Sequence, residues 1–265
     1  MLEYWHRQEK RKRLFESEID AEKPEQKRLA GKLVIVGGHE GAFFAVAAAA
    51  EEAMRLGVGE VVTVLPESLR GKVPEGDGVC FLEAEASGGF ARGAWRGLTE
   101  MAKTADLALI VGDLGKNTET AEFLREFLRE YEGEVVLARD AIDRMMDDVA
   151  DWASRENLTI CLTMRQLQKM TQALYYPRMV TLTTPVNQLV ETLHKMTLSL
   201  GMTVVTLSGG QILVARNGEV ISTTIAETAW TPITLWGGQF LARGATLRIW
   251  NRGVGAEKIW SRAVL

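Results

Sequence analysis

Short apolar runs recur along the chain and are separated by segments of mixed polarity. These runs are three to five residues long and rich in Val, Leu and Ile. Such composition is typical of strands that are covered on both faces. The runs predict strands at residues 33–36, 61–65, 79–82, 107–111, 135–137, 159–162 and 203–207.

The segments between most of these runs have the three- and four-residue spacing of an amphipathic helix. Residues 118–131 place Ala121, Leu124 and Phe127 on one face, with charges elsewhere. Residues 141–155 repeat the pattern,. Alternating strands and helices predict an α/β fold, in which a mainly parallel sheet has right-handed crossovers and helices on both faces.

The pattern changes in the last quarter of the chain. The run at 203–207 is followed by two further strand-like runs at 211–215 and 220–224, with Gly209-Gly210 and Asn217-Gly218 between them. Asn-Gly between such runs is a strong hairpin signal. We therefore expect antiparallel strands near the C-terminus, followed by a final helix.

The N-terminal segment differs in composition from the rest of the chain. Residues 1–21 are strongly charged and predict a separate N-terminal helix. Pro24 and the polar residues after it predict a linker. Residues 22–265 are then expected to form a single domain.

Composition narrows the class of protein. With 265 residues, of which 46% are hydrophobic, the chain can bury a sizeable core, and its net charge of −4 argues against nucleic acid as a partner,. Cys80 and Cys161 lie in apolar runs and predict buried thiols, which fits a cytoplasmic protein,. The charged N-terminus lacks the apolar core of a signal peptide, and no apolar run reaches transmembrane length, so no membrane partner is expected.

The most informative stretch is a strand that ends in the turn Gly37–Gly41 and continues as an Ala-rich helix. Free backbone N–H groups at the start of such a helix favour anions, so the turn predicts a phosphate cradle. The alternative is a tight turn with no ligand, in which His39 and Glu40 are solvated. The candidate residues are Gly37, Gly38, His39 and Gly41.

A second candidate loop follows the predicted strand at 107–111. Its glycines permit a close approach of the backbone to a ligand, and Lys116 offers a charge for a phosphate,. In the alternative interpretation, Asn117 only caps the helix that begins at Thr118. The candidate residues are Gly112, Asp113, Gly115 and Asn117.

Three further loops carry residues with two interpretations each. Asp140 follows a predicted strand and either caps the next helix or holds a ligand. Ser208 and Gly209 lie either in a binding loop or in an ordinary hairpin turn. Gly237 and Gly238 open the last helix, either as an anion site or as a helix start packed under tryptophans,.

Tryptophan is concentrated at the C-terminal end of the chain. Four of the seven tryptophans, Trp230, Trp236, Trp250 and Trp260, lie in the last 36 residues. Such density favours a core or a subunit interface over a cofactor site. We therefore expect a homo-oligomer.

The order of these loops resembles the ribokinase-like superfamily, and within it the ADP- or ATP-dependent NAD(P)H-hydrate dehydratase family. Gly37-Gly38-His39 matches that family's Gly-Gly-Ser turn, and residues 111–118 look like its Gly-Pro-Gly-Leu-Gly loop. Residues 137–142 look like its Asp-Ala-Asp-Ala-Leu segment, and residues 162–170 like its Thr-Pro-His-x-x-Glu segment. The resemblance covers about residues 22–250. It implies a three-layer ribokinase-like fold and a small-molecule nucleotide ligand: ATP or ADP, with an NAD(P)H-type molecule and Mg²⁺ as further candidates.

The chain departs from the family pattern at several chemical positions. The family's last motif is Gly-Thr-Gly-Asp, and the resemblance gives its Asp the role of the base in related kinases. Here the motif is Gly237-Gly238-Gln239, and an amide cannot take up a proton at neutral pH,. The other departures are Ala138, Arg139, Met164, Arg165, Gln168 and Ser208.

These observations leave three functions open. The first is a nucleotide-binding relative of the dehydratase with weak or absent catalysis. The second is a working dehydratase or small-molecule kinase that uses another carboxylate, Asp113 or Asp140. The third is an interaction protein on a ribokinase-like scaffold, with contacts through its charged N-terminus and Trp-rich C-terminus.

Overall fold

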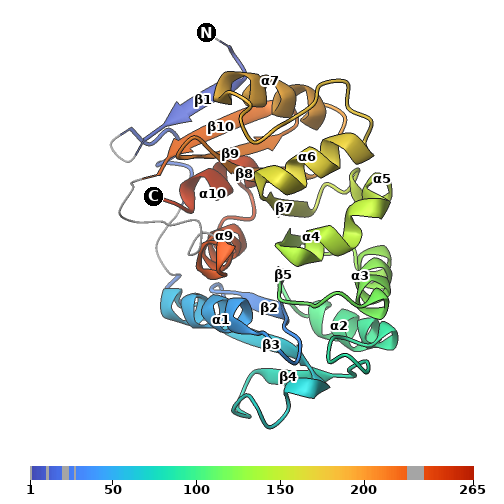
Figure 1. Ribbon diagram of the computed structural model, residues 1–265. Helices are drawn as coiled ribbons and strands as arrows, with labels where there is room; N and C mark the ends of the chain where they lie inside the picture. The colour runs from blue at the N-terminus through green and yellow to red at the C-terminus, as the bar shows by residue number, and fades with distance from the viewer. Residues whose placement is uncertain (1, 10–11, 20–23, 27, 226–235) are drawn as a thin grey trace.

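Ten strands form one continuous sheet in the computed structural model, which describes residues 2–9, 12–19, 24–26, 28–225 and 236–265. The strand order is β1-β10-β9-β8-β7-β6-β5-β2-β3-β4 (Figure 1). The strands are β1 (Trp5–Gln8), β2 (Lys32–Gly37), β3 (Glu60–Pro66), β4 (Val79–Leu82), β5 (Leu107–Gly112), β6 (Val135–Ala138), β7 (Leu158–Leu162), β8 (Thr203–Ser208), β9 (Gln211–Arg216) and β10 (Glu219–Thr224).

Most neighbouring strands in this sheet are parallel. The antiparallel pairs are β8–β9 and β9–β10. The two hairpins turn at Gly209-Gly210 and Asn217-Gly218, and all four residues have positive φ, as a type I′ turn requires,. The mainly parallel sheet with an antiparallel end is therefore confirmed.

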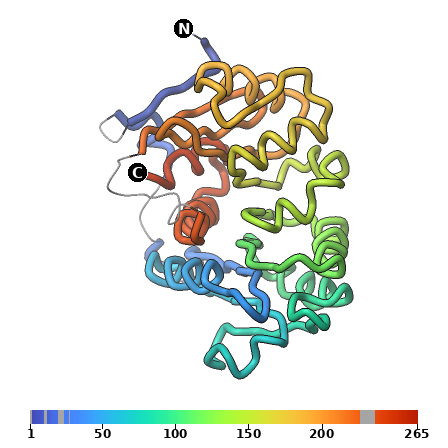
Figure 2. The backbone as a smooth tube through the Cα atoms, viewed as in Figure 1, coloured from blue at the N-terminus to red at the C-terminus, as the bar shows by residue number. Residues whose placement is uncertain are grey.

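Helices cover both faces of the sheet and give the fold three layers. One face carries α1, α9 and α10, and the other carries α2 to α7. In Figure 2 the red α9 lies beside the blue α1, although residues 57–238 separate them in sequence. The helices are α1 (Phe44–Leu56), α2 (Trp95–Ala102), α3 (Thr118–Glu130), α4 (Asp140–Met145), α5 (Val149–Trp152), α6 (Met164–Ala173), α7 (Val186–Thr197), α9 (Gln239–Trp250) and α10 (Ala256–Arg262).

The central strands supply both cores because successive side chains point to opposite faces. In β2, Leu33 and Ile35 pack under α1 and α9, whereas Val34 and Val36 join the core beneath α2 to α7. All four are fully buried. This double burial explains why the strands are continuous apolar runs in the sequence.

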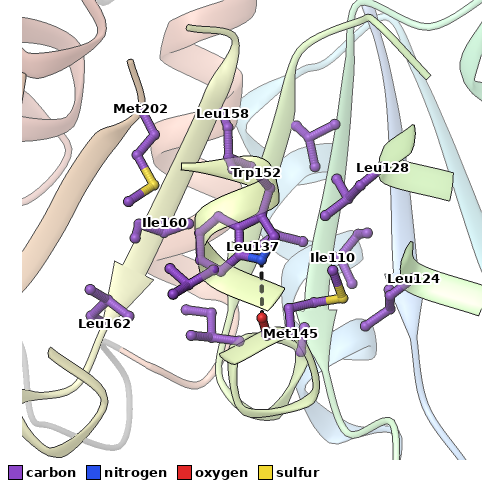
Figure 3. Packing of buried hydrophobic residues seen from close by; sticks show 14 of the residues in the cluster. Ile110, Leu124, Leu128, Leu137, Met145, Trp152, Leu158, Ile160, Leu162 and Met202 are labelled. Carbon is purple, nitrogen blue, oxygen red and sulfur yellow. Dashed lines mark hydrogen bonds between the residues drawn. The ribbon is translucent and has the colours of Figure 1, made fainter. Parts of the chain in front are cut away.

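The helix predicted at 141–155 is broken. It divides into α4, a 3-10 turn at Met146–Asp148, and α5. The carbonyl oxygen of Met145 at the end of α4 accepts a hydrogen bond of 3.0 Å from the indole of Trp152 (Figure 3). A side chain thus satisfies this carbonyl group, and Trp152 is buried in the core below,.

The helix predicted within residues 1–21 is wrong, because the described part of this segment contains the strand β1 instead. β1 pairs in parallel with β10 at the edge of the sheet. The indole of Trp5 donates to Ser222 Oγ at 2.9 Å, and Gln8 Nε2 donates to Thr223 Oγ1 at 2.8 Å. These partners, which are distant in sequence, stabilise a strand in a segment whose composition predicts a helix. The division of the chain at residue 22 stays a prediction.

Several single-residue predictions can be compared with this fold. Cys161 is buried, and burial raises the pKa of its thiol, but Cys80 is only half-buried against the core. Trp260 is fully buried and Trp250 partly buried, whereas Trp230 lies outside the described residues. Within the described ranges, no helix is both long and apolar enough to cross a membrane.

Candidate functional site

The start of α1 lies where the sequence predicts a phosphate cradle, and a carboxylate of the chain itself contacts it. Phe43, the residue before the helix, provides no side-chain cap. Instead, Asp113 Oδ2 accepts a hydrogen bond of 3.1 Å from the backbone N–H of Ala45. Asp113 comes from the loop after β5, next to β2 in the sheet. A negative charge at a helix N-terminus is stabilised there, so Asp113 takes the place an anionic ligand would favour.

Arg139 holds this carboxylate from the other side. Its guanidinium forms an ion pair with Asp113 Oδ1 and donates to the carbonyl oxygen of Trp236 at 3.2 Å. The side chain of Asp113 is only 9% exposed, and that of Arg139 is 33% exposed. The pair therefore joins the loops after β5 and β6 to the start of α1 and to the residues that precede α9.

Both partners of this ion pair have strained backbones. Asp113 has a φ of 58° and Arg139 a φ of 55°, in the region that favours glycine,. Such strain costs about 1–3 kcal/mol per residue and persists only where the surroundings impose it. Backbone strain of this kind is concentrated at functional sites, which marks the pair as the centre of the candidate site.

Asp140 supports the loop that carries Asp113. Its Oδ2 accepts a hydrogen bond of 2.8 Å from the backbone N–H of Leu114. A Cβ atom at Gly112, which has a φ of 102°, would overlap Asp140 Oδ1, so only glycine fits above this carboxylate,. Burial raises the pKa of Asp140, and its Oδ1 is a buried atom with no hydrogen-bond partner. Asp140 begins α4, but its hydrogen bond goes to the neighbouring loop and not to its own helix.

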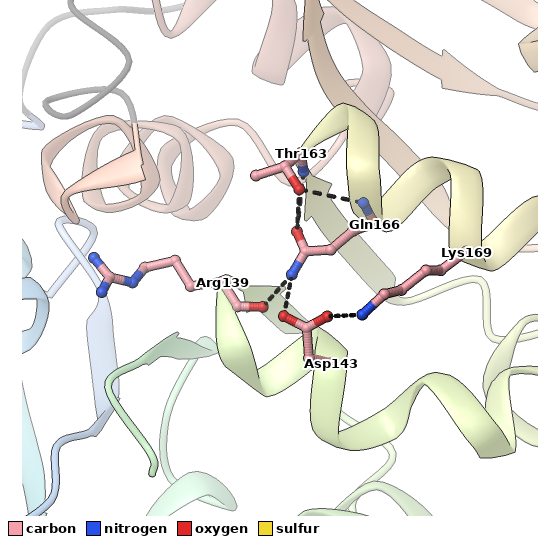
Figure 4. A network of polar contacts seen from close by, with 5 residues as sticks. All are labelled: Arg139, Asp143, Thr163, Gln166 and Lys169. Carbon is pink, nitrogen blue, oxygen red and sulfur yellow. Dashed lines mark hydrogen bonds and ion pairs between the residues drawn. The ribbon is translucent and has the colours of Figure 1, made fainter. Parts of the chain in front are cut away.

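Gln166 is a positioning residue that sequence reasoning missed. Its Nε2 donates to the backbone oxygen of Arg139 at 2.7 Å and to Asp143 Oδ2 at 2.9 Å (Figure 4). Its Oε1 accepts from the backbone N–H of Thr163, and the Thr163 hydroxyl caps α6 in return. Lys169 completes the network by pairing with Asp143. The spacing Thr-x-x-Gln signals this capping box, but not the link to Arg139.

Two adjoining cavities open on either side of the loop at 114–116. One has a volume of about 380 Å³ and is lined by the Asp113–Arg139 pair together with Asp140, Asp143 and Arg144. The other has a volume of about 420 Å³ and is lined by Ser87, Gly89 and Asn117. His39, Gly115 and Lys116 line both.

The residues that line the cavities differ in whether other groups of the protein bind their side chains. His39 Nδ1 accepts a hydrogen bond from the Gly41 N–H at 2.8 Å, so its ring is held by its own turn. Asn117 caps α3 by accepting from the Glu119 N–H at 2.7 Å, as the cap interpretation predicts. Lys116 is exposed, and none of the ion pairs among the described residues includes it. It is a cation with no carboxylate partner at the mouth of both cavities.

The second glycine turn lies at the same edge of the sheet. Gly238 has a φ of 111°, and a Cβ atom there would overlap the carbonyl oxygen of Ala45 in α1. Close packing of α9 on α1 therefore requires this glycine, whether or not a ligand binds. Gly237 is half-buried and Gln239 is exposed at the first position of α9.

Ser208 and Gly209 are not grouped with these residues. They lie in the hairpin between β8 and β9, where Ser208 pairs with Gln211 in the ladder. Among the described residues, neither of them lines the two cavities. The described residues also contain no cluster of three or more His, Cys, Asp or Glu side chains suited to a metal ion. A Mg²⁺ ion usually binds through substrate phosphates and one or two carboxylates, so such a cluster is not required for it.

The fold has clear relatives among solved structures. A ribokinase-like superfamily protein of Enterococcus faecalis superposes with a TM-score of 0.73 at 15% identity, over 98% of this chain and 86% of the other. This observation decides the fold. The chain has the ribokinase-like fold.

Two further structural neighbours are also distant in sequence. A hypothetical protein of Streptococcus mutans has a TM-score of 0.65 at 12% identity, over 91% of this chain and 81% of the other. The ADP/ATP-dependent NAD(P)H-hydrate dehydratase of Bacillus subtilis, crystallised with ATP and Mg²⁺, has a TM-score of 0.62 at 15% identity, over 93% and 82%. No protein-family model matches the sequence, and no curated protein matches it.

The ribokinase-like fold gives the site residues a common frame. Ligands of open α/β sheets bind outside the carboxyl ends of the strands. Asp113 and Arg139 follow β5 and β6 at this edge, within the two segments that resemble the Gly-Pro-Gly-Leu-Gly and Asp-Ala-Asp-Ala-Leu motifs. Arg139, which departs from the resembled family, is therefore the partner of Asp113 in this chain.

Proposed function

We propose that this protein binds a nucleotide at the carboxyl edge of the sheet and turns it over slowly or not at all. The observation that carries the proposal is the Asp113–Arg139 pair at the start of α1. It leaves the two cavities beside Lys116 for a ligand but places a carboxylate where a phosphate would otherwise lie. Gln239 at the start of α9 supports the same conclusion, because an amide is not a general base at neutral pH,.

The open part of the site suits an anionic ligand. Lys116 and Arg144 line the cavity of about 380 Å³, and His39 and Asn117 offer hydrogen-bonding groups close by. The three aspartates of this cavity already have partners: Asp113 pairs with Arg139, Asp140 accepts from the Leu114 N–H, and Asp143 binds Gln166 and Lys169. An ammonium group without a carboxylate partner is a ready point charge for phosphate. The ligand is expected to contact the loop at 114–116, which separates the two cavities.

A second function has one observation in its favour. Asp140 lines the same cavity, its Oδ1 lacks a partner, and burial raises the pKa of its carboxyl group. A carboxyl group with a raised pKa near a ligand site is a candidate acid or base. A working ATP- or ADP-dependent dehydratase or kinase that uses Asp140 is therefore the alternative. Asp113 suits this role less, because its two oxygens are bound by Ala45 and Arg139.

Ligand binding can be tested by thermal unfolding and isothermal titration with ATP, ADP, NADH and NADPH. We expect a nucleotide to raise the Tm and Lys116→Gln to weaken its binding about tenfold, as loss of one charge-assisted contact does. Lys103→Gln is the matched control, because Lys103 is an exposed lysine directly after α2 that pairs with Glu100. Equal binding by all three proteins would contradict a site at Lys116. Binding of no nucleotide would favour an interaction protein.

Catalysis is tested separately with hydrated NADH and ATP. We expect turnover well below about 1 s⁻¹ in the wild type, because positioned general-base catalysis is worth roughly 10²–10⁴-fold. Turnover at ordinary enzyme rates that Asp140→Asn abolishes would establish the alternative. A Gln239→Asp variant alone is not expected to restore activity, since residues that act as a unit are not additive.

A further inference from the structure

A second region rich in positive charge lies away from the carboxyl edge. It is a cavity of about 250 Å³ lined by Arg13, Arg243, Arg262, Thr246, Trp250 and Leu56, and we call it the arginine cavity. Leu56 ends α1, whereas Ala45 near the other end of this helix binds Asp113. A helix of this length spans about 20 Å. The arginine cavity shares no lining residue with the two cavities at the carboxyl edge.

Two helices, α9 and α10, and the N-terminal segment bring the arginines together. Arg243, Thr246 and Trp250 lie on one face of α9, at helical spacing,. Arg262 is the last residue of α10, and Arg13 lies between β1 and β2. The indole of Trp250 is held by a hydrogen bond of 3.2 Å to the Ala30 carbonyl oxygen, so this wall is fixed.

Two of the three guanidinium groups, those of Arg243 and Arg262, have no carboxylate oxygen closer than 3.8 Å among the described residues. Arg13 pairs with Glu16 at 2.9 Å, and Arg262 reaches the same carboxylate only at 3.8 Å. The Arg262 side chain is 12% exposed, and its Nη1 is buried without a hydrogen-bond partner. Among the described residues, Arg243 forms no ion pair, and the nearby Glu52 is bound by Arg55 at 2.7 Å.

This excess of charge is costly without an anion. An arginine stays protonated in proteins, so the cluster cannot become neutral by losing a proton. Burial lowers the pKa of both Arg243 and Arg262, which is the direction expected of cations that lack partners,. A buried charge is tolerated when it is paired and hydrogen-bonded.

We propose that the arginine cavity binds a small phosphorylated molecule with at least two negative charges. Guanidinium groups match phosphate oxygens with two parallel hydrogen bonds, and more than one guanidinium group is available here. Trp250 and Leu56 provide an apolar wall for the organic part of such a molecule. A ligand there would contact α1, α9 and α10 together and would stabilise the protein against unfolding.

Pyrophosphate is the simplest probe for this site, with inorganic phosphate as the weaker comparison. Thermal unfolding and isothermal titration are performed on Lys116→Gln protein, so that binding at the carboxyl edge is weakened. We expect pyrophosphate to raise the Tm and Arg243→Gln to weaken its binding at least tenfold. Arg243→Lys should retain part of the affinity because it keeps the charge.

Arg165→Gln is the matched control, because Arg165 is exposed on α6 and lines none of these cavities. It should leave pyrophosphate binding unchanged. Without ligand, Arg243→Gln should unfold at the same temperature as its parent or higher, because it removes repulsion. Equal pyrophosphate affinity with and without Arg243, or no binding at all, would overturn the proposal. Neither result bears on nucleotide binding at Lys116, which is measured on the wild type.

Discussion

Two regions of this molecule carry groups suited to binding an anion, and they differ in whether the chain itself supplies the anion. At the carboxyl edge, the start of α1 is bound by Asp113, and Arg139 holds Asp113 in place. In the arginine cavity, Arg243 and the Nη1 of Arg262 have no anionic partner among the described residues. In the first region the anion is the Asp113 carboxylate of the chain itself, whereas in the second region we propose that a ligand supplies it. A cluster of positive charge does not by itself identify a ligand site. The ligand site is better identified by the charged groups for which the chain supplies no partner of opposite charge.

The α1–α9 contact connects both regions, and breaking it should have the largest effect. Gly238→Val places a side chain on the Ala45 carbonyl oxygen and forces a β-branched residue to a φ of 111°. We expect a loss of about 4 kcal/mol in the free energy of unfolding, measured with urea. Gly253→Val is the control, because nothing lies within 4 Å of its Cβ position, and it should cost less than about 1 kcal/mol,.

Removing the cation from the internal pair should have the next largest effect. Arg139→Ala leaves the Asp113 carboxylate, which is only 9% exposed in the native structure, without its guanidinium partner. The expected loss is about 3 kcal/mol in the free energy of unfolding. Arg129→Ala, which removes an exposed arginine paired with Glu126, should cost less than about 1 kcal/mol,.

A double variant distinguishes the effect of the lost ion pair on stability from the effect of the lost packing of the Arg139 side chain. Arg139→Ala combined with Asp113→Asn should be more stable than Arg139→Ala alone, because no buried charge is left unpaired. If the second substitution destabilises the protein further by its full single-variant amount, the two residues are not coupled and the account of the pair is wrong.

Gln166 should matter less than the pair that it supports. Gln166→Ala removes hydrogen bonds to the Arg139 backbone and to Asp143, as well as the capping box of α6. A loss of about 2 kcal/mol in the free energy of unfolding is expected. Gln168→Ala on the same helix should change it by less than about 0.5 kcal/mol. Similar losses in both variants would mean that Gln166 acts only as a helical residue.

The pH dependence of stability gives the smallest of these effects. Burial raises the pKa of Asp140, so between its unfolded and folded pKa values the native state holds a proton that the unfolded chain has lost,. The contribution of Asp140 to stability is therefore greatest at low pH and falls as pH rises through this window, from about pH 4 upward. Asp140→Asn should remove this fall, measured as the difference between the Tm profiles of the two proteins. Parallel profiles would show that Asp140 does not titrate in this window.

The sequence predicted local features of this fold and missed those that depend on distant partners. The strand β2 could be predicted because burial on both faces restricts it to apolar residues. The turn at Asn217-Gly218 could be predicted because a positive φ restricts the residue types that can occupy it. The strand β1 was missed because it lies in a charged segment and pairs with β10 more than two hundred positions away.

In the candidate site, too, local features could be predicted from the sequence and contacts between distant residues could not. The helix cap at Asn117 was predicted because a cap is a local pattern. The contact of Asp113 with Arg139 was not, because it forms only when β5 and β6 lie side by side and both residues adopt positive φ. A phosphate cradle at the start of α1 stays a prediction, and the carboxylate bound there comes from a loop 68 positions further along the chain.

We propose that Asp113 takes the position of an anionic ligand at the start of α1. The most direct test is the affinity of Asp113→Gly for ADP by isothermal titration, compared with the wild type. Glycine accepts the φ of 58° at this position, and the substitution leaves both the Ala45 N–H and the Arg139 guanidinium available to a phosphate. Binding at least tenfold tighter than that of the wild type is expected, since a charge-assisted contact is gained and a repulsive carboxylate is lost. Unchanged or weaker binding would contradict the claim.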